Sequence, residues 1–324
     1  MRTTTTSLGR RIVAVLGVLL GCHSVQAGPF TPGNLIVGSQ TPGRSDQRIT
    51  EYRLDGTVVQ TLVAPLPPAS SDPYNPRDLV VGDDGRLHVY NGTFDPFLST
   101  YDPVGDAWSH TTHSGWNTIN NTSYGGIARF GNQVFVTDMK ISGDATSGVV
   151  VFDTASGTST SFASGLNATD LTRGLDGKLW VLAGDTAHAY DPTTFAPLGS
   201  VSVTAASSDV RGIAVDSNGD FFVANLDGTV ARLSSSGGLL DKIDLGFGVQ
   251  NIDVDVFATG LVAIGSRLDG AWLTDRQFST PLRFDADRWT SRVAFVVPEP
   301  TSLVLLGLGW LTLIFCIHRP PGPI

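Results

Sequence analysis

A short pattern recurs six times along the chain, and this repeat limits the fold more than any other feature of the sequence. In each copy a glycine or asparagine precedes an apolar run, as in Gly177-Lys-Leu-Trp-Val181 and Gly219-Asp-Phe-Phe-Val223. The six copies end at Val37, Val89, Val136, Val181, Val223 and Ile264. The steps between these ends are 52, 47, 45, 42 and 41 residues, which is the length of one four-stranded propeller blade. We therefore expect an all-β, six-bladed β-propeller.

Partner strands are expected on both sides of each repeated core. A strand precedes five of the cores, at residues 78–81, 126–128, 170–172, 212–215 and 251–254. Turn residues such as Asp176-Gly177 join this strand to the core as a hairpin. Behind the core we expect an edge strand that ends in an aromatic residue or leucine before a turn, as at Tyr101-Asp102-Pro103 and Tyr190-Asp191-Pro192.

The two ends of the repeat region complement each other. The first core has no preceding strand, whereas the last β-like stretch, residues 291–296, has no following core. The two halves would complete one blade, close the ring and hide its edges. One closed domain, residues 28–297, is therefore expected. A seventh blade would require further strands in residues 277–289.

Composition and charge favour a turn-rich β protein and exclude some functions. The chain has 37 glycines and few lysines, which favours strands and turns over helices. Its formal charge is −9, and removal of the two terminal segments leaves a body near −12, so a nucleic acid is not an expected partner. The two cysteines, Cys22 and Cys316, lie in the terminal apolar segments. The body therefore has no thiol for a disulfide, a metal site or nucleophilic catalysis.

The N-terminus resembles an export signal. Arg10-Arg11 precede an apolar run at residues 12–21, and Val25-Gln26-Ala27 is a small-x-small cleavage site before Gly28. Residues 1–27 are therefore expected to be a signal peptide. A second interpretation remains open, because residues 19–22 resemble a bacterial lipobox that would place a lipid on Cys22.

The C-terminus carries a more specific pattern. Residues 301–317 are an uncharged run that would nearly cross a bilayer core of about 30 Å as a helix. The run follows Val297-Pro298-Glu299-Pro300 and is followed by Arg319. This order resembles the PEP-CTERM sorting signal of Gram-negative bacteria, at residues 298–319 with a short tail at 320–324. The tail departs from that family, because several arginines are usual there and this chain has one.

The PEP-CTERM resemblance implies a route for the protein. It implies recognition by an exosortase, a membrane-embedded cysteine transpeptidase that cuts near the motif. The chain would be anchored in the inner membrane by its C-terminal helix before processing, and then reach the cell surface or the extracellular matrix. The resemblance says nothing about the activity of the body.

The body itself resembles the six-bladed propellers of the NHL, SMP-30 and lyase-like group, best at residues 212–223. Propellers of this kind place function at the mouth of the central channel, in the loops that lead into the innermost strand and those that follow the second. The channel-mouth candidates are Asn75, Arg77, Asp78, Tyr124, Asp170, Asp209, Arg211 and Asn251.

A divalent cation is the cofactor that this resemblance implies. Lactonase-type members bind one cation through acidic and amide side chains, and calcium or magnesium would suit such ligands. The candidates here are Asp78, Asp138, Asp170 and Asn225. The body has very few glutamates, however, and β-turns also require aspartate. We therefore favour turn chemistry and expect no cofactor.

Histidines and aromatic residues give two further candidates. His88 lies inside a core strand at the place that Trp180 occupies in another blade, so we favour packing over a general-base role. His110 and His113, with Trp108 and Trp116, lie in a connection between the second and third blades, where we favour an irregular loop over a metal or sugar site. If a polysaccharide binds, the stacking candidates are Trp108, Trp116 and Tyr124.

The sequence therefore predicts an exported, exosortase-sorted propeller that acts as a binding or scaffold module, linked to exopolysaccharide or biofilm, rather than an enzyme. The alternative is a metal-assisted lactonase or lyase on the same fold, and the fold by itself does not decide between them.

Overall fold

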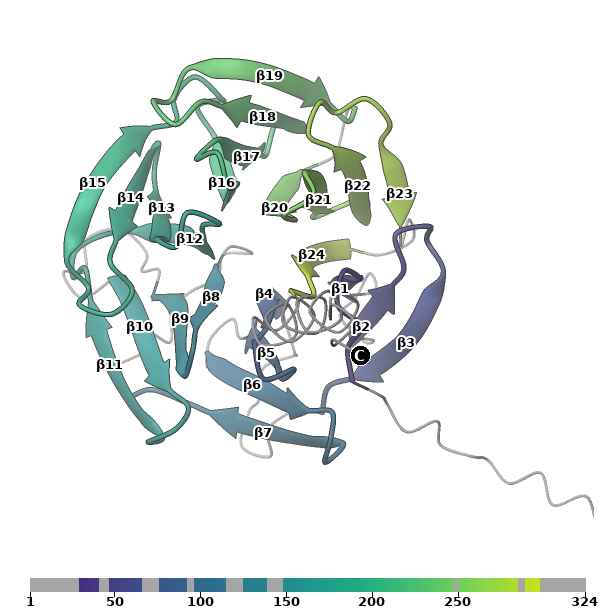
Figure 1. The fold of residues 1–324 in the computed structure, drawn as a ribbon, viewed down its shortest axis with the longest axis vertical. Coiled ribbons are helices and arrows are strands. Elements are labelled where there is room, and N and C mark those ends of the chain that lie inside the picture. Colours follow the sequence, from purple (N-terminus) through teal and green to yellow (C-terminus); the bar gives the residue numbers. More distant parts are fainter. Residues whose placement is uncertain are drawn as a thin grey trace, which may run out of the picture.

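The computed structural model describes residues 29–40, 47–65, 76–91, 96–114, 125–138, 148–246, 250–284 and 289–297. In this part of the chain six four-stranded antiparallel sheets surround a central axis, as Figure 1 shows. The described residues contain no helix, and so none that could span a membrane. The signal peptide and the C-terminal helix expected from the sequence lie outside these residues.

Each sheet is one blade, numbered here in chain order and written from the innermost to the outermost strand. Blade 1 consists of β24 (Trp289–Phe295), β1 (Leu35–Gln40), β2 (Gln47–Tyr52) and β3 (Val58–Val63). Blade 2 consists of β4 (Pro76–Val81), β5 (Leu87–Asn91), β6 (Phe97–Asp102) and β7 (Ala107–Thr111). Blade 3 consists of β8 (Ile127–Phe130), β9 (Gln133–Asp138), β10 (Gly148–Asp153) and β11 (Thr158–Phe162).

The remaining three blades follow the same order. Blade 4 consists of β12 (Ala168–Arg173), β13 (Leu179–Ala183), β14 (Thr186–Tyr190) and β15 (Pro197–Ser202). Blade 5 consists of β16 (Val210–Val215), β17 (Phe221–Asn225), β18 (Thr229–Leu233) and β19 (Leu239–Asp244). Blade 6 consists of β20 (Asn251–Val256), β21 (Leu261–Ser266), β22 (Ala271–Asp275) and β23 (Leu282–Phe284).

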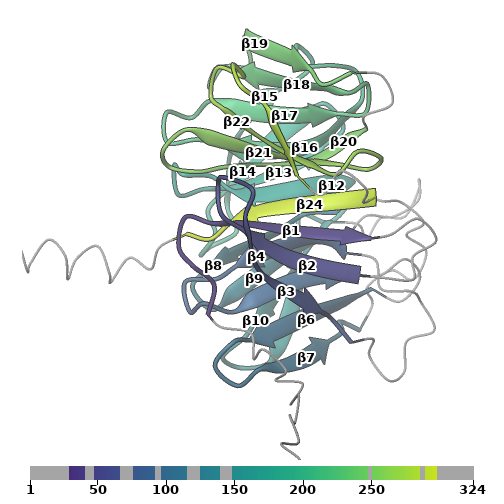
Figure 2. The ribbon, with the colours of Figure 1, turned by 90° about the vertical axis from the view of Figure 1, so that its right-hand side faces the viewer.

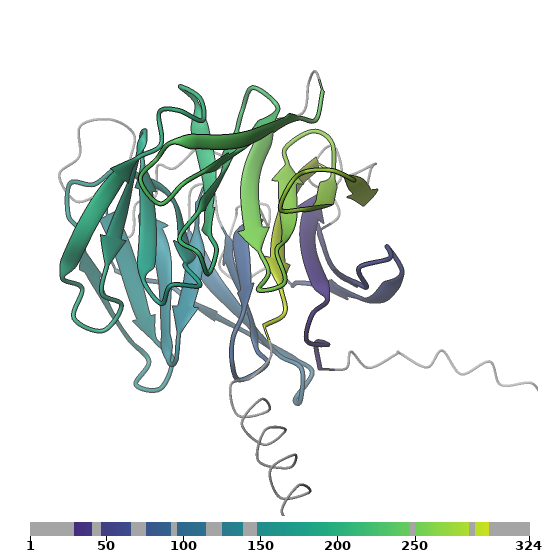
Figure 3. The same ribbon diagram turned by 45° about the horizontal axis from the view of Figure 1, so that its top comes forward.

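The expected blade count and ring closure are confirmed. β23 is the outermost strand of blade 6, so residues 277–289 add no seventh blade. β24 pairs antiparallel with β1, with Val293 opposite Val37, and Figures 2 and 3 show the two strands side by side. Backbone hydrogen bonds also join Val296 to Gly33 and Asn34 at 2.8 and 2.9 Å, so the first and last described segments leave the ring together.

One expectation about the blade was wrong. The strands expected at the edge, which end near Tyr52, Tyr101 and Tyr190, are the third strands, and a fourth strand lies outside each of them. The fourth strands are largely exposed, as in β11, where four of five residues are exposed. Such a strand has no buried face and therefore lacks the alternating apolar pattern by which strands are found.

The core lies between neighbouring blades. Second strands are buried on both faces, and every residue of β5 and β17 is buried. Large aromatic residues fill the space between blades 3 and 4, where Phe162 stacks on Phe195 with ring centroids 4.8 Å apart. The tight turns need glycine: Gly177, in the Asp176-Gly177 turn, has a φ of +82°, which side-chain-bearing residues rarely adopt.

Inner strands of adjacent blades approach most closely at glycine. A β-carbon added to Gly212 on β16 would lie 2.8 Å from the Cα of Asp253 on β20, closer than carbon atoms can pack. The absence of a side chain at Gly212 therefore allows blades 5 and 6 to meet.

We expect Gly212→Ala to lower the free energy of unfolding by about 1–3 kcal/mol, because the backbone of β20 would have to shift. Urea denaturation measures this change. Gly105→Ala is the matched control, since the nearest atom to its new β-carbon would be Ala107 Cβ at 3.9 Å. Equal effects of the two substitutions would contradict this account of the contact.

Candidate functional site

The inner strands of all six blades line a central cavity of about 200 Å³. Its wall combines apolar side chains with five aspartates. Four of them, Asp78, Asp170, Asp253 and Asp255, lie on inner strands, and the fifth, Asp83, lies in the β4–β5 turn. Asp78 and Asp170 were expected near the channel mouth, in loops or at strand starts; the structure places both within inner strands and in the same cavity.

The four aspartates on the inner strands join neighbouring blades. On every second blade, one carboxylate oxygen of the inner strand accepts a hydrogen bond from a backbone N–H of the next inner strand. The bonds join Asp78 to Ile127, Asp170 to Ile213 and Asp253 to Val293, each at 2.7 Å, and Asp255 to Phe295 at 2.8 Å. We call these contacts the carboxylate clasps.

Three of the four clasps use the same position of the inner strand, and Asp255 lies two residues beyond it on β20. On four of the inner strands this position is the first residue paired after a β-bulge, and the corresponding residues in blades 2, 4, 5 and 6 are Asp78, Asp170, Gly212 and Asp253. Aspartate and glycine thus alternate where blades 4, 5 and 6 follow one another. In blade 1 the side chain next to the clasped Val293 is Arg292, whose Nη1 donates to Ile252 O at 2.9 Å.

Burial keeps the clasp carboxyls protonated at a higher pH than usual. Desolvation raises the pKa of Asp78 well above its ordinary value, and the neighbouring Asp253 and Asp170 add to this effect, while Arg292 opposes it. Burial also raises the pKa of Asp170 and Asp253, and it raises the pKa of Asp255 to about 7. The four clasp carboxyls therefore carry less negative charge than four free carboxylates would.

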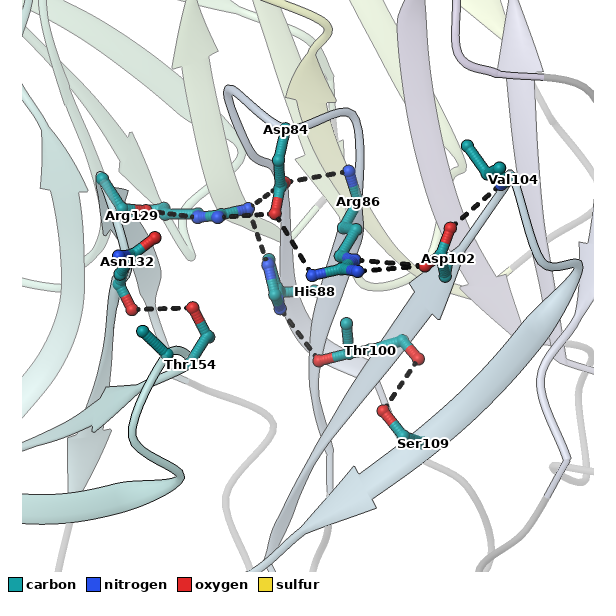
Figure 4. Close-up of polar contacts among 12 residues, drawn as sticks. Asp84, Arg86, His88, Thr100, Asp102, Val104, Ser109, Arg129, Asn132 and Thr154 are labelled. Atoms are coloured by element: carbon teal, nitrogen blue, oxygen red, sulfur yellow. Dashed lines mark hydrogen bonds and ion pairs between the residues drawn. The ribbon is translucent and has the colours of Figure 1, made fainter.

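A second polar cluster lies between blades 2 and 3 and is shown in Figure 4. Arg129 on β8 is buried and binds both carboxylate oxygens of Asp84 in the β4–β5 turn. Its Nη1 also donates to His88 Nε2 at 2.9 Å, and His88 Nδ1 lies 2.9 Å from Thr100 Oγ1. The expectation that His88 packs in the core agrees with its 1% exposure, but its neighbours here are polar.

This cluster fixes the protonation of His88. Burial, with a further contribution from the Arg129 charge, lowers the pKa of His88 to about 3, so the ring is neutral at physiological pH. Because Arg129 donates to Nε2, the ring proton must be on Nδ1, which therefore donates to Thr100. A histidine in this state cannot take a proton from the Thr100 hydroxyl, so the pair is not an activated nucleophile.

The residues suggested for a divalent cation lie in four different blades. Asp78 and Asp170 are clasp residues in blades 2 and 4, whereas Asp138 and Asn225 end the second strands of blades 3 and 5. Among the described residues no three His, Cys, Asp or Glu side chains are arranged to hold a metal ion. Asn225 is fully buried, and its Nδ2 donates to Thr229 O and Oγ1.

The other candidates are dispersed. Arg77 lies buried on β4, Asn251 is buried at the start of β20, and Asp209 forms an ion pair with Arg211 near the start of β16. Asn75, Tyr124 and Trp116 lie outside the described residues.

The aromatic and histidine candidates lie on the outside of blade 2. Trp108 and His110 belong to β7 rather than to an irregular loop, which corrects that expectation. Trp108 packs against Tyr101 with ring centroids 5.0 Å apart, and His113 Nδ1 lies 2.6 Å from Ser159 Oγ of blade 3.

Sequence reasoning missed several polar residues. Asp253 lies in the predicted strand at 251–254, in the position that Asp170 takes in the strand at 170–172, so alignment of the repeats could have found it. The pairing of Asp84 with Arg129 had no comparable signal, because the two residues are in different blades and 45 positions apart.

Known proteins show the fold and not the activity. Neither models of protein families nor curated proteins match the chain. A solved structure of catalytically inactive virginiamycin B lyase from Staphylococcus aureus, a histidine-to-alanine variant with quinupristin, is similar with a TM-score of 0.52 and 11% identity, over 83% of this chain and 86% of that one. A Bacteroides caccae protein of unknown function has a TM-score of 0.52 and 14% identity, over 81% and 99%. The Pan2 WD40 domain of Neurospora crassa has a TM-score of 0.50 and 10% identity, over 84% and 78%.

At these identities the likeness establishes architecture alone. The chain has a six-bladed β-propeller fold of the kind found in virginiamycin B lyase, and its structural neighbours include a lyase and a WD40 domain. Since this fold carries different activities, function must be argued from the residues of this chain.

We expect the half-buried Asp255 to make the fold less stable as pH rises. Its pKa is about 7 in the folded protein against an ordinary 3.8, so the fold retains a proton that the unfolded chain releases. This contribution is complete below about pH 4 and is lost as pH rises to 7, at up to about 1.4 kcal/mol per pH unit. Asp255→Asn should reduce the slope of the unfolding free energy against pH by the equivalent of about one proton. Urea unfolding from pH 4 to 8 measures this slope, and an unchanged slope would contradict the assignment.

We also expect Arg129→Gln to raise the pKa of His88, because the guanidinium charge and its hydrogen bond to Nε2 both disfavour the imidazolium. NMR titration of the His88 ring measures this pKa directly. Arg173→Gln, at an exposed arginine that pairs with Asp83, is the control and should leave it unchanged. A His88 pKa that stays near 3 in the Arg129 variant would mean that burial alone sets it.

Proposed function

We propose that this chain is a binding or scaffold propeller of the cell surface or extracellular matrix, delivered there by export and exosortase sorting. The fold supports a binding role, and the sequence of the two ends supports the route. Exosortase, and the membrane before processing, are the partners that this route requires; a polysaccharide is the ligand class that suits the destination.

The observation that carries the binding role is the use of the channel aspartates. A lactonase or lyase of this fold would need reactive groups in the cavity, but the four aspartates on the inner strands accept backbone hydrogen bonds between blades. None of the four histidines of the body is among the described residues of the cavity wall. In the virginiamycin B lyase variant a histidine replacement accompanies inactivity. The chain therefore offers no counterpart for that chemistry among the described cavity residues.

The position of Val297 supports an orientation for the anchored form. Val297 lines the cavity at the end of the inner strands and immediately precedes the proposed sorting motif Pro298-Glu299-Pro300. With no linker between fold and motif, this end of the channel faces the membrane before processing. The opposite end, where β4, β12 and β20 begin, then faces outward.

Replacement of Pro298-Glu299-Pro300 by three alanines tests the route, in a Gram-negative host that has an exosortase. We expect the wild-type chain to lose its C-terminal segment and reach the surface or medium, and the variant to remain full-length in the inner membrane. Cell fractionation and intact-mass measurement follow both outcomes. Replacement of Pro320 and Pro321 in the tail by alanine is the matched control. Unchanged processing of the motif variant would remove exosortase from the proposal.

A further inference from the structure

A second cavity, of about 410 Å³, lies between blades 2 and 3 on the outer part of the ring. Its volume falls in the range of small-molecule sites, roughly 300–1,000 Å³. It does not include the carboxylate clasps. We call it the blade 2–3 groove; its lining includes Arg86, Leu98, Thr100, Asp102 and Ala107 of blade 2 and Phe152 of blade 3.

Hydroxyl groups dominate the polar part of the groove. Five of its residues are serine or threonine, three from blade 2 and two from blade 3. Each hydroxyl can both donate and accept a hydrogen bond, as the hydroxyl groups of a sugar also can. Buried Leu98 and Phe152 supply apolar surface beside them, against which the C–H groups of a sugar ring can pack.

The charged groups of the groove include both signs. Arg86 Nη2 and Nε bind Asp102 Oδ2 at 3.0 and 3.3 Å, and the carboxylate of Asp153 lies on the blade 3 side. A polyanion would meet two carboxylates, and a polycation would meet the Arg86 guanidinium. A neutral ligand avoids both of these like-charge repulsions. The planar guanidinium and carboxylate groups can each contact two adjacent hydroxyls of such a ligand.

The Asp84–Arg129–His88 cluster orients one of these hydroxyls, that of Thr100. Since neutral His88 donates from Nδ1 to Thr100 Oγ1, the Thr100 hydroxyl is left to donate its own hydrogen elsewhere, and Thr100 lines the groove. His88 stays neutral over the physiological pH range, so this preference does not change with pH. Four linked residues thus hold a hydrogen-bond donor in place before any ligand arrives.

We propose that the blade 2–3 groove binds a neutral hexose unit of a polysaccharide. The inference rests on the proposed function and assigns its ligand class and site. The ring packs its C–H face toward Leu98 and Phe152, while its hydroxyls bond to Thr100, the other groove hydroxyls and the Arg86–Asp102 pair.

Isothermal titration calorimetry of the full chain in detergent tests the site, with cellotriose and maltotriose as neutral probes and trigalacturonate as the acidic one. We expect a neutral trisaccharide to bind and trigalacturonate not to bind. Ala107→Trp, which adds bulk at the groove without removing a side-chain hydrogen bond, should weaken binding at least about tenfold. Thr100→Ala should weaken it by about two- to tenfold, as loss of one hydrogen bond does.

Leu198→Trp, at an exposed position on the outer strand of blade 4, is the matched control and should bind as the wild type does. Thermal unfolding of each variant confirms that it is folded. Binding that persists in Ala107→Trp, preference for trigalacturonate, or no binding of either neutral probe would overturn the groove assignment. These outcomes are separate from the sorting experiment, which can succeed while this one fails.

Discussion

Each inner strand pairs with its neighbour in the blade on one side only, so backbone N–H groups along its other edge face the channel without a strand partner. The carboxylate clasps supply acceptors for four of these groups from the preceding blade. A buried N–H group without an acceptor costs about 1–3 kcal/mol. The clasps therefore satisfy donors at the channel edge and also fix how neighbouring blades meet. The close approach at Gly212 depends on the same alternation, since a side chain there would collide with the clasp strand.

This use of aspartate limits what the channel can do. Carboxyls that accept backbone hydrogen bonds while buried have a raised pKa and are held in place by the fold, so they differ from the exposed, converging ligands of a cation site. The polar network between blades 2 and 3 differs, because it reaches a surface groove. There His88 takes a position that Trp180 fills in blade 4, and polar contacts replace aromatic packing. This interface is the one at which we propose a ligand site.

How much of this was predictable depends on the residue. Each repeated core is a turn residue followed by a buried apolar run, so the six blades could be predicted from the sequence. The pairing of residues 291–296 with the first core could be predicted because each lacked a partner strand. The outer strands did not, because residues such as those of β11 are exposed and carry no apolar period. Asp78 and Asp170 were identified as channel residues, but as candidate ligands or turn formers; their hydrogen bonds to the next blade need contacts across 49 and 43 positions.

The repeat period predicted the architecture, and the position of the two cysteines excluded thiol chemistry from the body. The patterns at the two ends gave the expectation of an exported, sorted chain. Which polar residues meet became clear only from the packing of the blades. It placed Asp84 and Arg129 on His88, assigned the channel aspartates to backbone amides, and opened a hydroxyl-lined groove between blades 2 and 3. Such contacts join residues distant in the chain through blade packing, and no local pattern encodes the distance between two blades.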